Sequence, residues 1–402
     1  MFARFWRAKG KRRKAAGSPD TGAYRGATEN AARCSPLRRQ NPQGSRWPGR
    51  PAPDHRSSVR ISTYVLPILT KILGVKALLI AGGFGTRLRP LTYTRPKHLL
   101  PIANRPHLYH VYDLLQRHEV GEVVLLTSYL AETFQPAQLE AGTRGMTAIV
   151  THEEEPLGTA GALKNAQDIV GDETFLAFNG DVLTNMDLGS ILSFHRDREA
   201  EATIVLTPVP DPSAFGVVPT DQDGRVLGFI EKPPPGEAPT NQINAGVYVL
   251  EPSVLDRIPA DVEYSAERGL FPGLVSERAP IFAISTDAYW ADIGTPDNYL
   301  QVNLDALEGR FPTDAVAAPG PEAVVTAADS AIAEDARVSS ACLGPGSIVN
   351  PGAVVERSVL LPGAVIGSGS VVRDSILGEN TKVAPGALIE GETIADGEEV
   401  GW

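Results

Sequence analysis

Short apolar runs alternate with segments of helical spacing between residues 75 and 307. The runs carry almost no charge, which is typical of strands buried on both faces of a sheet. They are residues 75–80, 123–127, 148–151 and 175–178. Residues 107–118 and 161–170 lie between these runs and are predicted to form helices. This alternation predicts a mostly parallel sheet covered by helices on both faces, with ligands binding at the carboxyl ends of the strands.

The pattern changes after residue 330, where apolar residues recur about every six positions and Gly or Pro stands between them. The apolar residues at this spacing are Ile332, Val338, Ile348, Val354, Leu360, Val365, Val371, Leu377, Val383 and Ile389. A hexapeptide period predicts a parallel β-helix, with roughly four coils if about three hexapeptides close one coil. The spacing slips by one residue in places and leaves the register open. Such a short prism is expected to pack against the preceding domain or a partner chain.

Two other segments show neither pattern. Residues 1–60 are rich in Arg, Pro, Gly and Ser, and for residues 1–73 we expect a basic, disordered extension or an over-long gene model whose true start lies near Val75. A basic tail for anionic surfaces is the alternative. Residues 311–330 are rich in Ala and Pro and are predicted to be a linker. The expected domains are therefore residues 74–310 and 331–402.

Charge and cysteine content narrow the functional classes. The net charge is −11, although residues 1–60 hold fifteen Lys/Arg against three Asp/Glu. The acidic remainder argues against nucleic-acid binding by the folded part. Cys34 and Cys342 are the two cysteines, which provides no disulfide framework and suits a reducing cytoplasm. The longest apolar region, residues 61–83, is interrupted by a proline and two lysines, so no membrane span is expected.

A glycine-rich turn follows the first apolar run, and cations follow the turn. Residues 79–90 read L-I-A-G-G-F-G-T-R-L-R-P, and residues 95–101 read R-P-K-H-L-L-P. Glycine lets backbone N–H groups turn toward a ligand, and Arg87, Arg89 and Lys97 place cations beside them. These features together predict a seat for a polyphosphate. The glycines alone would indicate only a tight turn, and the string matches neither common phosphate loop.

Further polar strings lie at the ends of the later apolar runs. Residues 179–181 read N-G-D, and residues 289–296 read Y-W-A-D-I-G-T-P. An aspartate in such a place can simply cap the next segment. Residues 153–161 read E-E-E-P-L-G-T-A-G and open a helix, where Gly158 and Thr159 could likewise serve only as a cap.

Three strings lie between the two aspartate strings. They read F-G-V-V at residues 215–218, F-I-E-K-P at residues 229–233 and N-A-G-V at residues 244–247. A sugar phosphate needs carboxylates and amides for its hydroxyls and a cation for its phosphate. Taken alone, E-K-P would indicate only a charged turn after a strand.

Taken together, the strings resemble the signature of the sugar nucleotidyltransferases, also called nucleotide-sugar pyrophosphorylases. The resemblance rests on A-G-G-x-G-T-R-L-x-P followed by P-K-x-L-x-P, and it covers about residues 75–307. Within the family, R-L-R-P-L-T and E-P-L-G-T-A-G resemble bacterial mannose-1-phosphate guanylyltransferases most. The resemblance implies an α/β fold, a Rossmann-like nucleotidyltransferase domain with a mostly parallel sheet, followed by a short C-terminal left-handed parallel β-helix.

The resemblance also implies which residues form the site. It assigns catalysis to Arg87, Lys97 and Asp181, and Mg²⁺ binding to Asp181 and Asp292, whose oxygens suit a hard cation. The residues implied to bind the nucleotide are Ala81, Gly82, Gly83, Gly85, Thr86, Arg87, Lys97, Gly158 and Thr159. Those implied to bind the sugar phosphate are Gly216, Glu231, Lys232 and Asn244.

The implied reaction is in-line attack by a sugar-1-phosphate oxygen on the α-phosphorus of a nucleoside triphosphate, with pyrophosphate leaving. The attacking oxygen is already deprotonated, so positioning and charge neutralisation are sufficient without a general base. GTP with mannose-1-phosphate is the expected pair, and a homo-oligomer is expected. The alternatives are a glucose-1-phosphate thymidylyl- or adenylyltransferase and a non-catalytic regulatory homologue. An acyltransferase is a further alternative, because hexapeptide β-helices often carry one. Such enzymes usually need a histidine base on the β-helix, and all seven histidines of this chain precede the repeats, so this alternative is disfavoured.

Overall fold

The computed structural model describes residues 74–401. The extension expected for residues 1–73 lies outside this range. Within the described residues, no helix is long and apolar enough to cross a bilayer.

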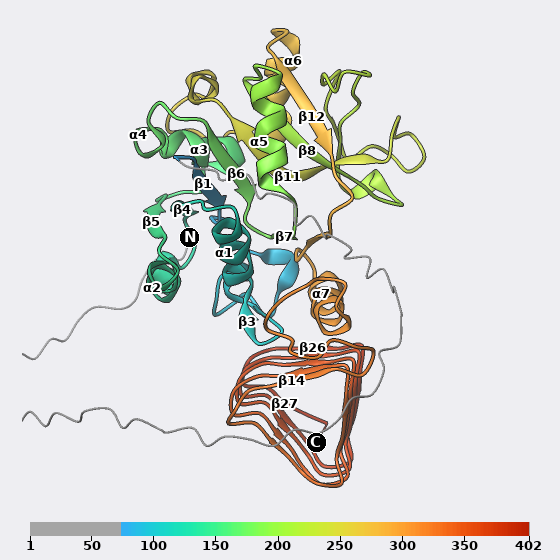
Figure 1. Ribbon diagram of the computed structural model, residues 1–402. Helices are drawn as coiled ribbons and strands as arrows, with labels where there is room; N and C mark the ends of the chain where they lie inside the picture. Colours follow the sequence, from blue (N-terminus) through green and yellow to red (C-terminus); the bar gives the residue numbers. More distant parts are fainter. Residues whose placement is uncertain (1–73, 402) are drawn as a thin grey trace, which may run out of the picture. The chain divides into compact units, whose positions relative to one another are not determined.

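A nine-stranded sheet forms the first part of the described chain (Figure 1). Across the sheet the strands are β10 (Ile230–Glu231), β9 (Gly216–Val217), β11 (Gln242–Leu250), β6 (Phe175–Asn179), β1 (Lys76–Ile80), β4 (Glu122–Thr127) and β5 (Thr147–His152). Beside β11 lie β8 (Ala202–Pro208) and β12 (Ile281–Ser285). The half from β6 to β5 is parallel, as predicted, with Leu79 opposite Leu125 and Phe178. β11 runs antiparallel to β6 and β8.

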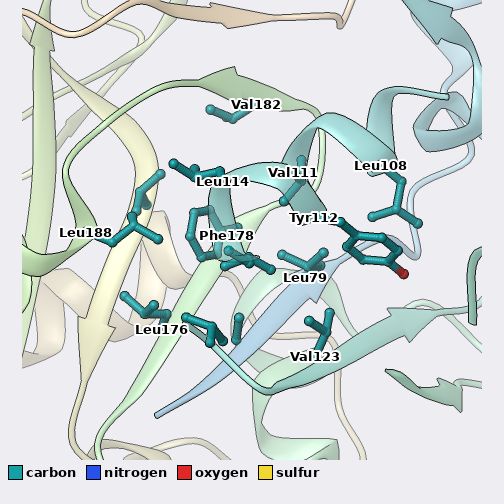
Figure 2. Close-up of a cluster of buried hydrophobic side chains, with 14 of the residues drawn as sticks. Leu79, Leu108, Val111, Tyr112, Leu114, Val123, Leu176, Phe178, Val182 and Leu188 are labelled. Atoms are coloured by element: carbon teal, nitrogen blue, oxygen red, sulfur yellow. The ribbon is translucent and has the colours of Figure 1, made fainter. Parts of the chain in front are cut away.

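Helices cover both faces of this sheet. The α-helices are α1 (His107–Arg117), α2 (Gln135–Thr143), α3 (Gly158–Asn165), α4 (Gln167–Val170), α5 (Leu188–Asp197), α6 (Phe271–Ser276) and α7 (Pro296–Glu308). α1, α2 and α5 pack on one face, and α3, α4 and α6 pack on the other. Successive side chains of a strand point to opposite faces, so Leu79 lies with α1 whereas Leu78 lies with α3. Figure 2 shows the α1 face, where Leu108, Val111 and Leu114 lie over the strand residues.

Short turns of helix and short ladders complete this domain. The 3₁₀ turns are η1 (Thr86–Leu88), η2 (Lys97–Leu99), η3 (Ala131–Phe134), η4 (Pro212–Ala214) and η5 (Pro252–Arg257), and η6 (Ala266–Leu270) is a π turn. The two-stranded ladders are β2 (Pro101–Ile102) with β3 (Arg105–Pro106), and β7 (Val182–Thr184) with β13 (Trp290–Asp292).

The C-terminal part is a stack of parallel strands in three sheets (Figure 1). One sheet holds β14 (Val324–Thr326), β17 (Ala341–Leu343), β20 (Val359–Leu360), β23 (Ile376–Leu377) and β26 (Thr393–Ile394). The second holds β15 (Ala331–Ile332), β18 (Ile348–Val349), β21 (Val365–Ile366), β24 (Lys382–Val383) and β27 (Glu399–Val400). The third holds β16 (Arg337–Ser339), β19 (Val354–Glu356), β22 (Val371–Arg373) and β25 (Leu388–Glu390). The predicted fold class, an α/β transferase domain followed by a parallel β-helix, is confirmed.

The structure fixes the β-helix register that the sequence left open. Val349 pairs with Ile366, and Ile366 pairs with Val383, one coil further along. Several residues selected by the six-residue spacing are not the inner ones, because the residue that follows each of them is buried instead. The buried followers are Val349, Val355, Ile366 and Val372. β14 lies inside the expected linker 311–330 and already pairs with β17, so strand pairing of the stack begins before residue 331.

The β-helix packs directly against the transferase domain. One buried cluster joins Leu100 and Ile102 with Tyr299 of α7 and with Cys342 and Ile376 of the β-helix. This agrees with the first of the two packing partners expected for a short prism. Cys342 is a buried free thiol, and burial raises its pKa to about 12.

Candidate active site

The predicted phosphate turn lies at the carboxyl end of the central strand. Ala81 follows β1 and donates its backbone N–H to the Leu126 carbonyl, 2.7 Å away. Gly180 follows β6 and donates to the Ile80 carbonyl at 3.0 Å. The glycine turn and Asp181 therefore lie at one edge of the sheet, because β1 and β6 are parallel neighbours.

Lys97 and Asp181 form an ion pair in which Lys97 Nζ lies 2.5 Å from Asp181 Oδ2. Both side chains are more than four-fifths buried. Burial alone would raise the pKa of Asp181, but the adjacent Lys97 ammonium holds it well below its usual range. The carboxylate is therefore ionised at neutral pH and can bind a cation.

A first cavity, of about 260 Å³, lies between this pair and the glycine turn and is lined by both. Of the residues implied to bind the nucleotide, it is lined by Gly82, Gly83, Lys97, Gly158 and Thr159. A side chain at Gly158 is excluded, since φ is +73° and a Cβ would lie 2.9 Å from the Tyr264 carbonyl oxygen.

The remaining implied nucleotide ligands lie outside this cavity. Ala81 is buried behind the turn, and the Gly85 carbonyl accepts a hydrogen bond from Thr92 Oγ1 at 2.8 Å. Thr86 and Arg87 are exposed at the start of η1.

Glu153 lines the same cavity, although the sequence pattern did not single it out as a ligand. The residue is 4% exposed. Its Oε2 accepts the Leu157 backbone N–H at 3.1 Å, whereas its Oε1 is buried without a partner among the described residues. Burial raises the pKa of this carboxyl group. Buried polar atoms in proteins are normally hydrogen-bonded, so a carboxylate oxygen without a partner next to a cavity is a candidate acceptor for a bound molecule.

A second cavity, of about 190 Å³, lies on the other side of Asp181. All four residues implied to bind the sugar phosphate line it, together with Arg87, Asp181 and Asp292. Asn244 is fixed by two hydrogen bonds, from its Nδ2 to Tyr248 Oη at 2.8 Å and from Gly246 N to its Oδ1 at 3.0 Å. A Cβ at Gly216 would lie 2.6 Å from the Phe229 ring, so close packing requires glycine there.

Asp292 reaches Asp181 through a short antiparallel ladder. β13 places Asp292 opposite Val182, and Ile293 N donates to the Asp181 carbonyl at 3.0 Å. Asp292 Oδ1 accepts from Gly294 N at 2.8 Å and from Asn298 Nδ2 at 3.2 Å. These bonds hold the carboxylate at the wall of the second cavity.

The donor set fits a hard divalent cation that completes its shell with substrate oxygens. Asp181 and Asp292 supply carboxylate oxygens to one cavity. Within residues 74–401, no three acidic, histidine or cysteine side chains gather as a self-sufficient metal site. Phosphate and water oxygens would have to supply the other ligands, as is usual for Mg²⁺.

Glu267 connects the two cavities, and sequence reasoning missed it. Its Oε2 accepts from Thr159 Oγ1 and from Ser265 Oγ, both at 2.8 Å. Thr159 lines the first cavity, while Glu267 lines the second. The pairing joins residues 108 positions apart, so no local pattern could have revealed it.

The chain matches two family models. Residues 76–309 match the model described as nucleotidyl transferase, and residues 321–401 match the one described as GMPPB C-terminal domain.

Several curated proteins are similar to the chain. The mannose-1-phosphate guanylyltransferase of Mycobacterium tuberculosis is 37% identical over 287 residues, which cover 71% of this chain and 79% of that protein. The mannose-1-phosphate guanylyltransferase catalytic subunit beta of Drosophila pseudoobscura pseudoobscura is 42% identical over 230 residues, 56% of this chain and 61% of that protein. The UTP–glucose-1-phosphate uridylyltransferase of Synechocystis is 33% identical over 322 residues, which cover 71% of this chain and 82% of that protein.

Solved structures share the transferase fold. HddC from Yersinia pseudotuberculosis has a TM-score of 0.51 at 29% identity and covers 57% of this chain and 98% of that chain. The HddC structure complexed with GMP-PN has a TM-score of 0.50 at the same identity and coverage.

Proposed function

The chain belongs to the nucleotidyl transferase family, and from this premise we propose that it transfers GMP from GTP to mannose-1-phosphate, releasing pyrophosphate. The two cavities that meet at Asp181 support this proposal, because the reaction needs one site for a triphosphate and one for a sugar phosphate. The names of the relatives support the choice of substrates.

The residues at the junction of the cavities have complementary tasks in this scheme. Lys97, in the first cavity, and Arg87, which lines the second cavity together with Asp181, neutralise the triphosphate, and the N–H groups of the glycine turn orient it. The sugar-1-phosphate lies beside Lys232, with its hydroxyls on Glu231 and Asn244. Its phosphate oxygen attacks the α-phosphorus in line while pyrophosphate leaves on the opposite side. Asp181 and Asp292 hold a divalent cation, for which we propose Mg²⁺, and such a cation supplies neutralisation of the developing charge.

Glu153 is the observation that carries the choice of base. An ionised carboxylate offers only acceptors. Glu153 lines the first cavity, and its buried Oε1 has no partner among the described residues. Guanine presents two adjacent donors, N1–H and N2–H, on its pairing edge. Adenine presents an acceptor at N1, and uracil or thymine presents N3–H between two carbonyl acceptors. A carboxylate can therefore accept two hydrogen bonds from guanine, but only one from the adenine N6 amino group or from N3–H of uracil or thymine, where it also faces an acceptor.

The proposal extends to the setting of the enzyme. The buried Cys342 thiol suits a reducing cytoplasm. A homo-oligomer is proposed as well, since a β-helix exposes two further sheet faces that a second copy can cover.

A pyrophosphate-release assay tests the substrates directly. GTP, ATP, UTP and dTTP are each combined with mannose-, glucose- and N-acetylglucosamine-1-phosphate at fixed Mg²⁺. We expect kcat/KM to be highest for GTP with mannose-1-phosphate. A preference for UTP or dTTP with glucose-1-phosphate would overturn the substrates and leave the reaction class standing. If the folded, chemically intact protein turns over none of these pairs, the proposed enzymatic function is wrong.

A further inference from the structure

The segment that carries Lys97 touches the C-terminal β-helix at both of its ends. We propose that Arg95 is a positioning residue, held by two β-helix carboxylates, and that the β-helix thereby places Lys97 for catalysis. The inference rests on the proposed function only in that Lys97 serves nucleotidyl transfer. It makes the C-terminal domain a working part of the active site.

Arg95 is gripped by consecutive coils of the β-helix. Its Nη1 lies 2.9 Å from Glu379 Oε1, and its Nη2 lies 2.6 Å from Asp396 Oδ2. Thr94 Oγ1 donates to the same Asp396 oxygen at 2.6 Å. The other oxygen, Asp396 Oδ1, accepts the Glu379 backbone N–H at 2.7 Å, so the two carboxylates are fixed relative to one another.

The burial of this contact distinguishes it from the other ion pairs of the β-helix. The side chains of Arg95 and Asp396 are 13% and 19% exposed, and that of Glu379 is 39% exposed. In the Arg357–Asp374 pair the corresponding values are 49% and 47%. Exposed pairs contribute little to structure, whereas a rigid, largely buried guanidinium fork that is held by the largely buried Asp396 and also by Glu379 constrains its own backbone.

Little freedom remains between Arg95 and Lys97. Pro96 is the single intervening residue, and its ring restricts φ, which is −62° here. The Pro96 carbonyl accepts from Leu99 N at 3.0 Å, and the Lys97 carbonyl accepts from Leu100 N at 3.1 Å. The position of the Arg95 guanidinium therefore constrains the backbone of Lys97, because one rigid residue and a hydrogen-bonded turn connect the two.

The far end of the segment is also held by the β-helix. Asn104 Nδ2 donates to the Leu343 carbonyl at 2.6 Å and to the Val325 carbonyl at 3.2 Å. The buried cluster of Leu100 and Ile102 with Cys342 lies between the two attachments. The apolar cluster supports folding of both domains, so the charged contact at Arg95 is the part whose removal can separate positioning from stability.

The test removes the carboxylates rather than Arg95, since both lie on the β-helix and outside the transferase domain. The variant is Glu379→Gln/Asp396→Asn, in which both side chains keep nearly their shape. The matched control is Asp374→Asn, which breaks the exposed Arg357 pair on the same β-helix. Arg95→Lys is a third variant, which keeps the charge but cannot bridge both carboxylates with a planar fork.

We expect the double variant to lose on the order of tenfold in kcat, with the KM for the triphosphate changed by less than about threefold, because a misplaced Lys97 weakens charge neutralisation in the transition state. Arg95→Lys should lose less, and Asp374→Asn should match the parent. Hydrogen exchange of the Leu99 and Leu100 amides should accelerate in the double variant, to a smaller extent in Arg95→Lys, and not in Asp374→Asn. All rates are taken per folded protein, at a temperature well below every melting transition.

Unchanged kcat in the double variant would overturn the inference, whatever its melting temperature. An equal loss in Asp374→Asn would overturn it as well, because the effect would then belong to the β-helix in general. The measurement uses whichever substrate pair the parent turns over best. A failure of the GTP and mannose-1-phosphate proposal is therefore seen in the parent, and a failure of the positioning inference is seen in the variants.

Discussion

Lys97 Nζ lies 2.5 Å from Asp181 Oδ2 and joins two sequence strings that are 84 residues apart. The Lys97 ammonium holds the pKa of the largely buried Asp181 carboxyl group below its usual range. In the proposed mechanism, Lys97 exchanges the carboxylate for phosphate oxygens when a triphosphate binds, and Asp181 Oδ2 is then free for a cation. On this proposal the ion pair keeps both charge-neutralising groups in place before the substrate binds.

Lys97→Met should lower kcat by on the order of 10²-fold, by analogy with the removal of one electrostatic stabiliser. The methionine keeps the apolar stem but leaves the Asp181 carboxylate buried without its ammonium. Steady-state kinetics check this, and Lys382→Met, at an exposed β-helix lysine, serves as the control. A loss confined to KM would contradict a role in the transition state.

Asp181→Asn and Asp292→Asn should each fold normally and lose metal-dependent turnover by on the order of 10²-fold. Both acids line one cavity, so the double variant should be little worse than either single variant. The measurement is turnover against Mg²⁺ concentration for all three. Near-parental rates in either single variant, or fully multiplicative losses in the double, would contradict a shared ion.

Glu153→Gln should relax the choice of base, because the amide adds a donor where the carboxylate had only acceptors. The kcat/KM for GTP should fall by about 10- to 100-fold, and the ratio of UTP to GTP turnover should rise. Glu154→Gln, the exposed neighbour, is the matched control. An unchanged GTP to UTP ratio would exclude Glu153 from base recognition.

The parts of the site that the sequence predicts are those formed directly at strand ends. The Gly82 turn follows β1 and Asp181 follows β6, and neighbouring parallel strands necessarily bring these ends together. Asp292 joins them through β13, a ladder of three residues that the family-like string marked but no periodicity could place.

Pairings between distant polar side chains could not be predicted in this way. Glu267 meets Thr159 across 108 residues, and Arg95 meets Asp396 across 301 residues. In the sequence, nothing distinguishes these polar side chains from others at the surface, and only the folded structure shows which of them pair. The inward-facing residues of the β-helix were predicted wrongly for a different reason. Val354 and Val355 are both apolar, and only the turn geometry decides which of the two enters the core.

We expect the His110 side chain to lower the free energy of unfolding at acidic pH. Its ring is 3% exposed, its Nε2–H donates to the Ile102 carbonyl at 3.0 Å, and its Nδ1 accepts from Thr313 Oγ1. Burial lowers its pKa from 6.5 to about 4, against an opposing effect of the Ile102 carbonyl. Between these two values the unfolded chain binds the proton more readily, so stability falls as the pH falls from 6.5 to 4.

His110→Gln isolates this contribution, because glutamine can still donate to the Ile102 carbonyl but does not titrate. Denaturant unfolding is measured at several pH values for both proteins. The difference between the two free energies of unfolding should change by up to about 1.4 kcal/mol per pH unit in this window and level off above pH 7. Parallel curves for the two proteins would show that the ring of His110 does not carry the effect.

Gly180→Ala should damage both stability and catalysis, because the methyl group has no space. A Cβ at this position would lie 2.5 Å from the Ile80 carbonyl oxygen and 2.9 Å from the His98 ring. His98 follows Lys97, and Gly180 precedes Asp181. Relief of the clash therefore has to separate the two partners of the ion pair, and we expect kcat to fall at least tenfold.

The matched control is Gly273→Ala in α6, where nothing lies within 4 Å, and where alanine should stabilise the helix slightly. Adding His98→Ala to Gly180→Ala should restore part of the activity, since the ring is one of the two obstacles. Full parental kinetics in Gly180→Ala would show that the backbone at this edge of the sheet can yield without moving Lys97 from Asp181.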